Sequence, residues 1–363
     1  MGTTMFSQNN DLNNESKYLF YLDNSELGNS ITFNDLVVKY LNFFKIDPIN
    51  RTELSRSWQM TLSRIESKLK DFFGSQKINQ IDQRLLMHFR EHMREQGIKD
   101  ITIDQYFNVI RKLLKFAYQH QWIDRIPEFP ELKKVSVSRG GFSIQEYRKI
   151  LRYVQKNRSM NTIELLDTCS HREKREGLYR LDQAIPYEFL WLVRFMVNSF
   201  LRPVDIKLIQ HKHVQIVRGT HCYLRLSLPE TKNHRSKIIT LPASVSIYEN
   251  LKKFMGHRGL AEPDDYLFMP NIRDRSIAGH LITKFFREVL IALNLRKGSL
   301  GQNRTLYSLR HTAITFRLLY GKGIDLLTLA KNARTSVEMI ERFYASELDP
   351  EMNVAMLHSR RTS

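Results

Sequence analysis

The sequence predicts a mainly α-helical protein of two domains, with a small antiparallel β-sheet in the second domain. Apolar residues recur at helical spacing through most of residues 31–123. Residues 124–141 (DRIPEFPELKKVSVSRGG) contain two prolines and two adjacent glycines and show no helical period, which is typical of a linker. Residues 222–241 alternate apolar and polar side chains on both sides of a polar turn, which is the pattern of a β-hairpin.

The first domain is predicted to contain four helices, preceded by a flexible N-terminal arm over residues 1–30. The arm is rich in asparagine, serine and acidic residues, and a small accessory domain is the alternative. Asp82 is expected to cap the third helix, which Gly97 ends, and a capping box from Thr102 to Gln105 is expected to open the fourth. The predicted core stripes of the first two helices are Phe33, Leu36, Val37, Tyr40 and Leu41, then Leu62, Ile65, Leu69 and Phe72.

The second domain is expected to span residues 142–363 and to open at a capping box formed by Ser143 and Glu146. Residues 156–184 are polar and predict a loop or an irregular insert. The segment 187–200 (YEFLWLVRFMVNSF) is apolar on nearly all sides, so we expect a central, buried helix that ends just before Arg202.

Three short helices are predicted between residues 305 and 346. Ser308 is the expected N-cap of the first, which would put Arg310 in the first turn, where a guanidinium and free backbone N–H groups can meet an anion. The second runs over residues 325–331. A capping box from Thr335 to Glu338 is expected to open the third, which carries Tyr344.

The charge of the chain indicates a polyanionic partner. Its 363 residues carry a formal net charge of +18, with a pI of about 9.8. Nucleic acid is the first candidate and an anionic membrane surface is the rival. The sequence contains no apolar run long enough to span a membrane and no signal-peptide core. Its two cysteines, Cys169 and Cys222, are far apart, so we expect a soluble protein of a reducing compartment.

The C-terminal stretch resembles the tyrosine recombinases, the integrases of phages and mobile elements. The resemblance rests on SLRHT around Arg310, on TSVEMIERFY leading to Tyr344, and on the spacing between them. It covers residues 31–350 and is strongest after residue 185. It implies that residues 31–123 form a SAM-like core-binding domain, that residues 142–363 form the catalytic domain, and that the two form a clamp around DNA.

Cleaving DNA without a metal ion requires a nucleophile, cations that neutralise the transition state, and an acid for the departing 5′ oxygen. No metal-ligand cluster stands out in the sequence, and arginine suits the second role because its fork binds phosphate oxygens bidentately. The resemblance implies that Arg202 and Arg310 supply the charge, that Tyr344 attacks, and that Lys232 near the hairpin tip is the acid. Lys237 is the alternative acid, because the sequence leaves the register of the turn open.

Two positions depart from the pattern of the family. It usually has histidine three positions before the second arginine, where this chain has Tyr307, and histidine or tryptophan nine positions before the nucleophile, where it has Thr335. A phenol donates a hydrogen bond to phosphate but is a poorer proton shuttle than histidine at neutral pH. The Thr335 hydroxyl can contact phosphate, although helix capping explains it fully.

Two further residues are expected to support the catalytic ones. We interpret Asp205, three positions after Arg202, as a residue that orients this arginine. His311 follows Arg310 directly and points about 100° away from it on a helix, so we interpret it as a packing or supporting residue.

The resemblance also implies how the protein acts on DNA. It implies a site-specific recombinase that cleaves and rejoins duplex DNA through a covalent 3′-phosphotyrosine, without metal, ATP or another cofactor. Synapsis of two DNA sites by a homotetramer and a location at the nucleoid, in the bacterial cytoplasm, are further expectations. Basic residues one turn apart in the first domain are the candidates for phosphate contacts, namely Arg64, Lys68, Arg111 and Lys115.

Three alternatives remain open from the sequence. Residues 324–343 also resemble a helix-turn-helix, which would make the protein a transcription regulator, although Arg334 stands where the turn usually has glycine. A recombinase that binds DNA without cutting it is the second alternative. A relaxing topoisomerase with the same chemistry is the third.

Overall fold

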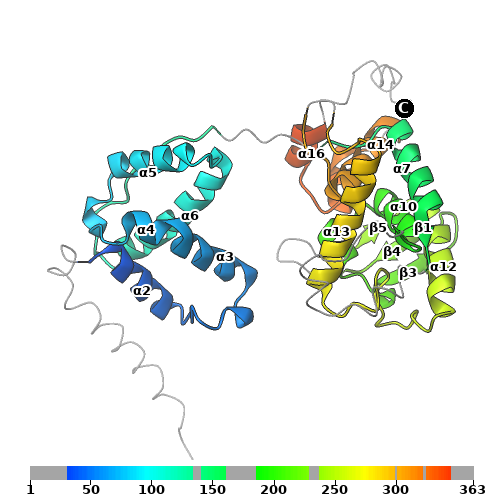
Figure 1. Ribbon diagram of the computed structural model, residues 1–363, viewed down its shortest axis with the longest axis horizontal. Coiled ribbons are helices and arrows are strands. Elements are labelled where there is room, and N and C mark those ends of the chain that lie inside the picture. Colours follow the sequence, from blue (N-terminus) through cyan, green and yellow to red (C-terminus); the bar gives the residue numbers. More distant parts are fainter. Residues whose placement is uncertain are drawn as a thin grey trace, which may run out of the picture. The chain divides into compact units, whose positions relative to one another are not determined.

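The computed structural model describes residues 31–133, 140–160, 185–228, 237–298, 301–321 and 324–344, and divides into two compact units, Met1–Ser136 and Val137–Ser363 (Figure 1). The predicted N-terminal arm, Lys232, most of the predicted insert and the tail after Tyr344 lie outside the described residues. Both units are mainly helical, and the second contains a small antiparallel sheet, so the predicted fold class is confirmed. The division between the units falls within residues 124–141, whose role as a linker stays a prediction.

The secondary structure described in the first unit is helical, apart from one isolated β-bridge between Thr32 and Lys77. One π-helical turn, Ile65–Leu69, joins two of its helices, and short 3-10 turns lie at Arg51–Glu53 and Ile78–Gln80. Its helices are α2 (Phe33–Phe43), α3 (Arg56–Arg64), α4 (Lys70–Phe73), α5 (Gln83–Glu95) and α6 (Asp100–Gln119).

The helix patterns of this unit are largely confirmed. The predicted stripe of α2 is buried throughout. The Asp82 side chain accepts a hydrogen bond from the Leu85 backbone N–H and caps α5, and Gly97 ends that helix with a φ of +73°. The predicted opening of α6 at Thr102 is wrong, since this helix begins at Asp100.

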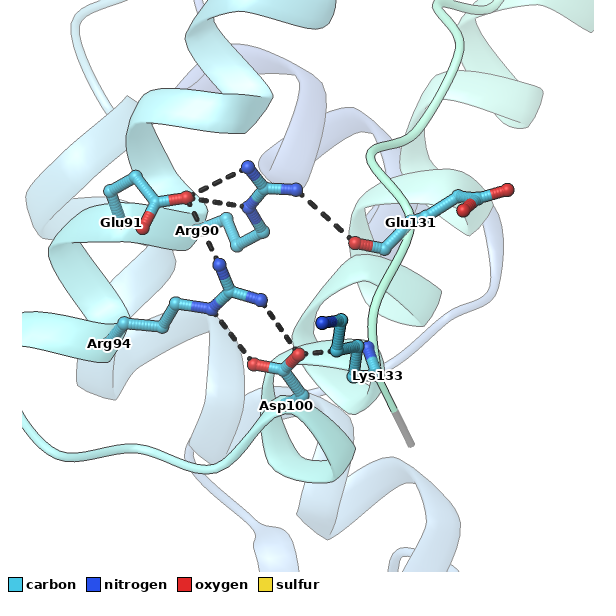
Figure 2. A network of polar contacts seen from close by, with 6 residues as sticks. All are labelled: Arg90, Glu91, Arg94, Asp100, Glu131 and Lys133. Carbon is cyan, nitrogen blue, oxygen red and sulfur yellow. Dashed lines mark hydrogen bonds and ion pairs between the residues drawn. The ribbon is translucent and has the colours of Figure 1, made fainter. Parts of the chain in front are cut away.

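A polar network explains the earlier start of α6 (Figure 2). The Asp100 carboxylate accepts two hydrogen bonds from the Arg94 guanidinium, at 3.0 and 2.8 Å, and one from the Lys133 backbone N–H at 2.9 Å. A negative charge in the first turn also interacts favourably with the helix dipole and stabilises the helix. Arg90 donates to the Glu131 carbonyl oxygen at 3.2 Å. These contacts hold residues 131–133 against helices α5 and α6.

The second unit carries the sheet and a central helix. A 3-10 turn, His211–His213, precedes the sheet. The helices are α7 (Ile144–Asn157), α10 (Phe189–Ser199), α11 (Pro203–Ile206), α12 (Ala243–Gly256), α13 (Arg275–Ala292), α14 (Tyr307–Tyr320), α15 (Leu326–Asn332) and α16 (Val337–Tyr344). The strands are β1 (Arg158–Ser159), β2 (Ile185–Pro186), β3 (Val214–Val217), β4 (Tyr223–Leu226) and β5 (Ile238–Ile239).

The predicted hairpin is present as the antiparallel pair of β4 and β5, with Leu226 opposite Ile238. Strand β3, which the sequence did not predict, pairs antiparallel with β4 on its other side. The short strands β1 and β2 form a separate parallel pair.

Helix α10 is the core of the second unit, as its uniformly apolar sequence predicts. It packs on α7, α12 and α14, and its residues from Phe189 to Val197 are largely buried. The predicted capping box of Ser143 and Glu146 opens α7. Helix α10 ends at Ser199, and the left-handed backbone of its C-cap, Phe200 (φ +58°), turns the chain sharply toward Arg202.

Candidate active site

The turn after α10 positions Arg202. This residue is the N-cap of α11, and Pro203 at the first helical position favours the helix start. The Asp205 carboxylate accepts hydrogen bonds from the Arg202 backbone N–H at 3.0 Å and from its Nε at 3.1 Å. Asp205 is mostly buried, so the pair holds the Arg202 side chain in one orientation.

Arg310 lies in the first full turn of α14, but the predicted cap of this helix is wrong. The helix begins at Tyr307, one residue before the predicted Ser308 cap, and Leu306 is its N-cap. Ser308 is inside the helix and fully buried, where its hydroxyl accepts a hydrogen bond from the Thr305 backbone N–H. The packing of Leu306 and Leu309 in the core therefore decides where this helix starts.

The Arg310 guanidinium joins two segments that are distant in sequence. It is buried and donates hydrogen bonds to the backbone carbonyl oxygens of Phe200 and Ala333. Burial lowers the pKa of Arg310, and the nearby positive charge of Arg202 lowers it further. An arginine remains protonated under these conditions, so this charge is kept at an energetic cost.

Tyr344 is the last residue of α16, and only 6% of it is exposed. It packs in a small apolar cluster with Phe200, Ala313 and Ile340. Burial raises the pKa of the Tyr344 phenol, and the opposing effect of the Arg310 charge offsets only part of that rise. Arg310 therefore lies near enough to Tyr344 to act on it electrostatically.

His311 lies between the two tyrosines of this region. Its ring centroid is 5.3 Å from that of Tyr307 and 5.1 Å from that of Tyr344. The histidine is buried, so its ring supports the position of both aromatic side chains. The Tyr307 phenol also lies close enough to Arg310 and Tyr344 to affect their pKa values.

The capping box predicted from Thr335 to Glu338 is wrong by one residue. Helix α16 begins at Val337, and the Ser336 hydroxyl accepts the capping hydrogen bond from the Met339 backbone N–H at 3.2 Å. The Thr335 backbone N–H donates to the Ala330 carbonyl oxygen instead, which closes the end of α15. The Thr335 side chain, half-buried, is not used as a helix cap.

Arg334, which was not predicted as a site residue, also belongs to this region. It connects α15 and α16, has a left-handed φ of +53°, and is 4% exposed. Asp205 and Arg202 both act electrostatically on its guanidinium. The signal in the sequence was an arginine at the one turn position where glycine is expected.

The structure brings some predicted residues together and leaves others apart. Arg202, Asp205, Tyr307, Arg310, His311 and Tyr344 share one region with Arg334. Lys232 lies outside the described residues, whereas Lys237 is exposed directly before β5.

The candidate DNA contacts of the first unit are basic side chains with different environments. Arg64 donates a hydrogen bond to the Gln105 side chain, and Lys68 donates to that of Gln96. Arg111 bonds Asn108 and lies 4.2 Å from the centre of the Phe129 ring. Lys115 is exposed.

Two further properties of the described residues concern membrane spanning and metal binding. None of the described helices has the length and apolar character needed to cross a lipid bilayer. The same residues contain no group of three or more histidine, cysteine, aspartate or glutamate side chains placed to hold a metal ion.

Comparison with known proteins identifies the first unit and the overall fold. Residues 48–133 match the phage integrase SAM-like domain. A search of curated protein sequences finds no match.

Solved structures of integrases and recombinases resemble the chain over most of its length. The integrase of the transposon Tn1549, solved with a circular intermediate DNA, has a TM-score of 0.60 at 14% identity, over 90% of this chain and 99% of that one. A lambda integrase dimer on a core site has a TM-score of 0.59 at 14% identity, over 93% and 81%. The site-specific recombinase XerH on its difH substrate has 0.50 at 15% identity, over 83% and 76%. The chain therefore combines a phage integrase SAM-like domain with the fold of the tyrosine recombinases.

Proposed function

We propose that the protein is a site-specific DNA recombinase that cleaves and rejoins duplex DNA through Tyr344. One observation carries the proposal: the buried Arg310 donates hydrogen bonds to the carbonyl oxygens of Phe200 and Ala333, and both of these residues pack in the apolar cluster that contains Tyr344. Phe200 lies two residues before Arg202, and Arg310 acts electrostatically on both Tyr344 and Arg202. These residues come from three separate elements, α14, α16 and the turn before α11. A phosphate between two such cations would be held beside a nucleophilic hydroxyl.

In the proposed reaction, the Tyr344 phenol oxygen attacks the phosphorus of a DNA phosphodiester. The bond between phosphorus and the 5′ oxygen breaks, and a 3′-phosphotyrosine bond forms. Arg202 and Arg310 neutralise the charge of the five-coordinate transition state, and Lys232 protonates the leaving 5′ oxygen. The phosphotyrosine keeps the energy of the broken bond, so the reverse attack by a 5′ hydroxyl rejoins DNA without ATP.

The raised pKa of Tyr344 constrains this reaction. The phenol is neutral near pH 7, because burial disfavours the phenoxide more than Arg310 favours it. Its proton must therefore pass to water or to a phosphate oxygen as the bond to phosphorus forms. Tyr307 is proposed to donate a hydrogen bond to a phosphate oxygen. The hydroxyl of Thr335, which does not cap a helix, is proposed to contact the phosphate. His311 is proposed to hold Tyr344 in place.

The proposed partner is duplex DNA that carries a recombination site, held by residues 31–123 and 142–363. The net charge of +18 and the DNA present in the related structures support this partner. A tetramer on two synapsed sites at the bacterial nucleoid is part of the proposal. DNA affinity should then fall steeply with added salt, and an affinity that hardly changes would contradict it.

The alternative of a helix-turn-helix regulator fits the described residues less well. In α16 the side chains that face solvent include Glu338 and Glu341, which would repel DNA phosphates in a groove. The opposite face, with Ile340 and Tyr344, is buried against the rest of the unit. Neither face of this helix is suited to reading bases.

Adduct formation tests the proposal against a recombinase that binds without cutting. The protein is incubated with a library of suicide duplexes, each with a nick that lets the cleaved fragment escape. A protein–DNA adduct that survives SDS is expected, and mapping of the DNA-linked peptide should identify Tyr344. Binding without any adduct would favour the non-cutting alternative. Relaxation of supercoiled DNA without strand exchange would favour the topoisomerase.

The identity of the general acid has its own test. Lys232→Ala should cleave an ordinary duplex poorly and recover on a duplex whose 5′ leaving oxygen is replaced by sulfur, because a thiolate leaves without an acid. Lys237→Ala is the matched control and should respond equally to both duplexes. Recovery of Lys237→Ala instead would transfer the role to Lys237.

A further inference from the structure

Arg334 holds an unfavourable place for an arginine. As the residue after α15, it is left-handed, in the position at which helices usually end with glycine. Its backbone N–H and that of Thr335 donate to the carbonyl oxygens of Lys331 and Ala330, which closes the helix end. A side chain with a Cβ costs about 1 kcal/mol in this conformation, so the turn itself does not favour arginine.

The surroundings of Arg334 connect it to the proposed catalytic residues. The carbonyl oxygen of the preceding residue, Ala333, accepts a hydrogen bond from Arg310, and the same guanidinium bonds the Phe200 carbonyl oxygen. Phe200 lies two residues before Arg202 and is also left-handed. Arg310 thus braces the two sharp corners of the chain that present Arg202 and Arg334.

Positive charge gathers around these corners. Arg202, Arg310 and Arg334 bring three guanidiniums to one region, and the Asp205 carboxylate acts on both Arg310 and Arg334. Arg310 and Arg334 are 3% and 4% exposed, so solvent screens them poorly. Like charges buried together destabilise a fold unless an anion is bound between them.

We infer that Arg334 is a third cation that binds the scissile phosphate, together with Arg202 and Arg310. This inference rests on the proposed function, because that function supplies the phosphodiester. Arginine at this turn is then explained by its charge, since a phosphodiester and its more negative transition state would stabilise guanidiniums that are buried together.

Substitution of Arg334 by glycine distinguishes the effect of the guanidinium charge from the effect of the backbone conformation. Arg334→Gly removes the guanidinium and adopts the left-handed conformation without a steric cost, and Arg334→Asn, which also tolerates it, is the second variant. Arg218→Gly is the matched control, because Arg218 also lies outside the helices and is 64% exposed beside Glu249. Each protein is tested on an ordinary suicide duplex and on one whose scissile phosphate is a neutral methylphosphonate.

The two substrates distinguish phosphate binding from a structural role. On the ordinary duplex we expect Arg334→Gly and Arg334→Asn to form adduct roughly a hundredfold more slowly than the unmodified protein. On the methylphosphonate the difference should shrink to a few-fold, because one negative charge no longer needs a cation. An equal loss on both substrates, or no loss on either, would overturn the inference.

A measurement without DNA separates this inference from the proposed function. Inorganic phosphate should raise the melting temperature of the unmodified protein and of Arg218→Gly more than chloride does at equal ionic strength. Both variants at position 334 should lose most of that increment, and an unchanged increment would refute phosphate binding by Arg334. Failure of the unmodified protein to form any adduct, with the phosphate effect intact, would count against the recombinase and not against the anion site.

Discussion

The starts of α13 and α14 each bury an arginine, and the two arginines have different surroundings. Arg275 at the start of α13 is 9% exposed, and its guanidinium lies 3.9 Å from the centre of the Tyr266 ring. Three of its nitrogens donate to four backbone carbonyl oxygens, those of Lys207, Phe268, Met269 and Ile272, at 2.6–2.9 Å. Its donors are used within the fold, and we interpret it as a structural brace.

Arg310 in α14 is more deeply buried but has fewer backbone acceptors. It bonds two carbonyl oxygens, and its neighbours include a second arginine and two phenols. A guanidinium has five N–H donors, so Arg310 keeps donors that a phosphate can use. Two buried arginines can therefore differ in the number of their backbone acceptors and in the charge of their neighbours. These differences are the basis for proposing a catalytic role for Arg310 and a structural role for Arg275.

The largest expected effect tests whether the Arg310 region performs chemistry at all. Tyr344→Phe removes the proposed nucleophilic oxygen and keeps the ring that packs with Ile340. The covalent adduct should fall to background on a denaturing gel, while DNA binding stays unchanged. Tyr307→Phe is the control and should slow the reaction without abolishing it. An adduct formed by Tyr344→Phe would show that Tyr344 is not the nucleophile. The proposed chemical role of the Arg310 region would then lose its basis.

Loss of either proposed catalytic arginine should be the next largest effect. Arg202→Ala and Arg310→Ala should each slow adduct formation by about a hundredfold or more, because transition-state charge loses a donor. DNA affinity, measured by fluorescence anisotropy, should change much less. A loss of affinity as large as the loss of rate would show that these residues bind DNA without special contact to the transition state.

Arg275→Ala should lower the stability of the fold more than Arg310→Ala does. Four buried carbonyl oxygens lose their donor, which should lower the free energy of unfolding by about 3 kcal/mol or more, measured by urea denaturation. Arg310→Ala leaves two such oxygens and relieves repulsion from Arg202, so a loss of about 1–2 kcal/mol is expected. Equal losses in the two variants would contradict the distinction between the two regions.

The buried phenol should be visible in the alkaline stability of the protein. Burial holds the pKa of folded Tyr344 above the unfolded value of about 10. Its contribution to stability is therefore complete below pH about 10 and is lost as pH rises through the folded pKa. Tyr344→Phe should lose less stability over that range. Tyr320→Phe, at an exposed site, should behave like the unmodified protein.

The smallest expected effect concerns the start of α16. Ser336→Ala should cost about 1 kcal/mol, because the Met339 backbone N–H loses its acceptor. Thr335→Ala should leave the melting temperature nearly unchanged, and a slower adduct formation would indicate that its hydroxyl contacts phosphate. A greater loss of stability from Thr335→Ala would restore the cap predicted from the sequence.

Local patterns in the sequence determined most of the helices and the class of the fold. Helical periodicity located α2 and α5, and alternation located β4 and β5, because burial of one face imposes a period on apolar residues. A run that is apolar on nearly all sides located α10. Caps with one strong candidate, Asp82 and Ser143, were also predicted correctly. The motifs around Arg310 and Tyr344 indicated the family whose fold the chain has.

Tertiary structure decided the features that depend on residues distant in sequence. The starts of α6, α14 and α16 differ from the local predictions. Arg94 and Lys133 bind the first turn of α6, and the core around Leu306 fixes the start of α14. The closed end of α15 takes up the Thr335 backbone and so moves the start of α16. From the sequence, Arg334 stood out only as a poor turn residue of a helix-turn-helix, and its place beside Arg202 was not predicted, for the same reason. Its left-handed turn and its proximity to Arg202 exist only once α10, α14 and α15 have packed together, since electrostatic coupling depends on distance in space and not along the chain.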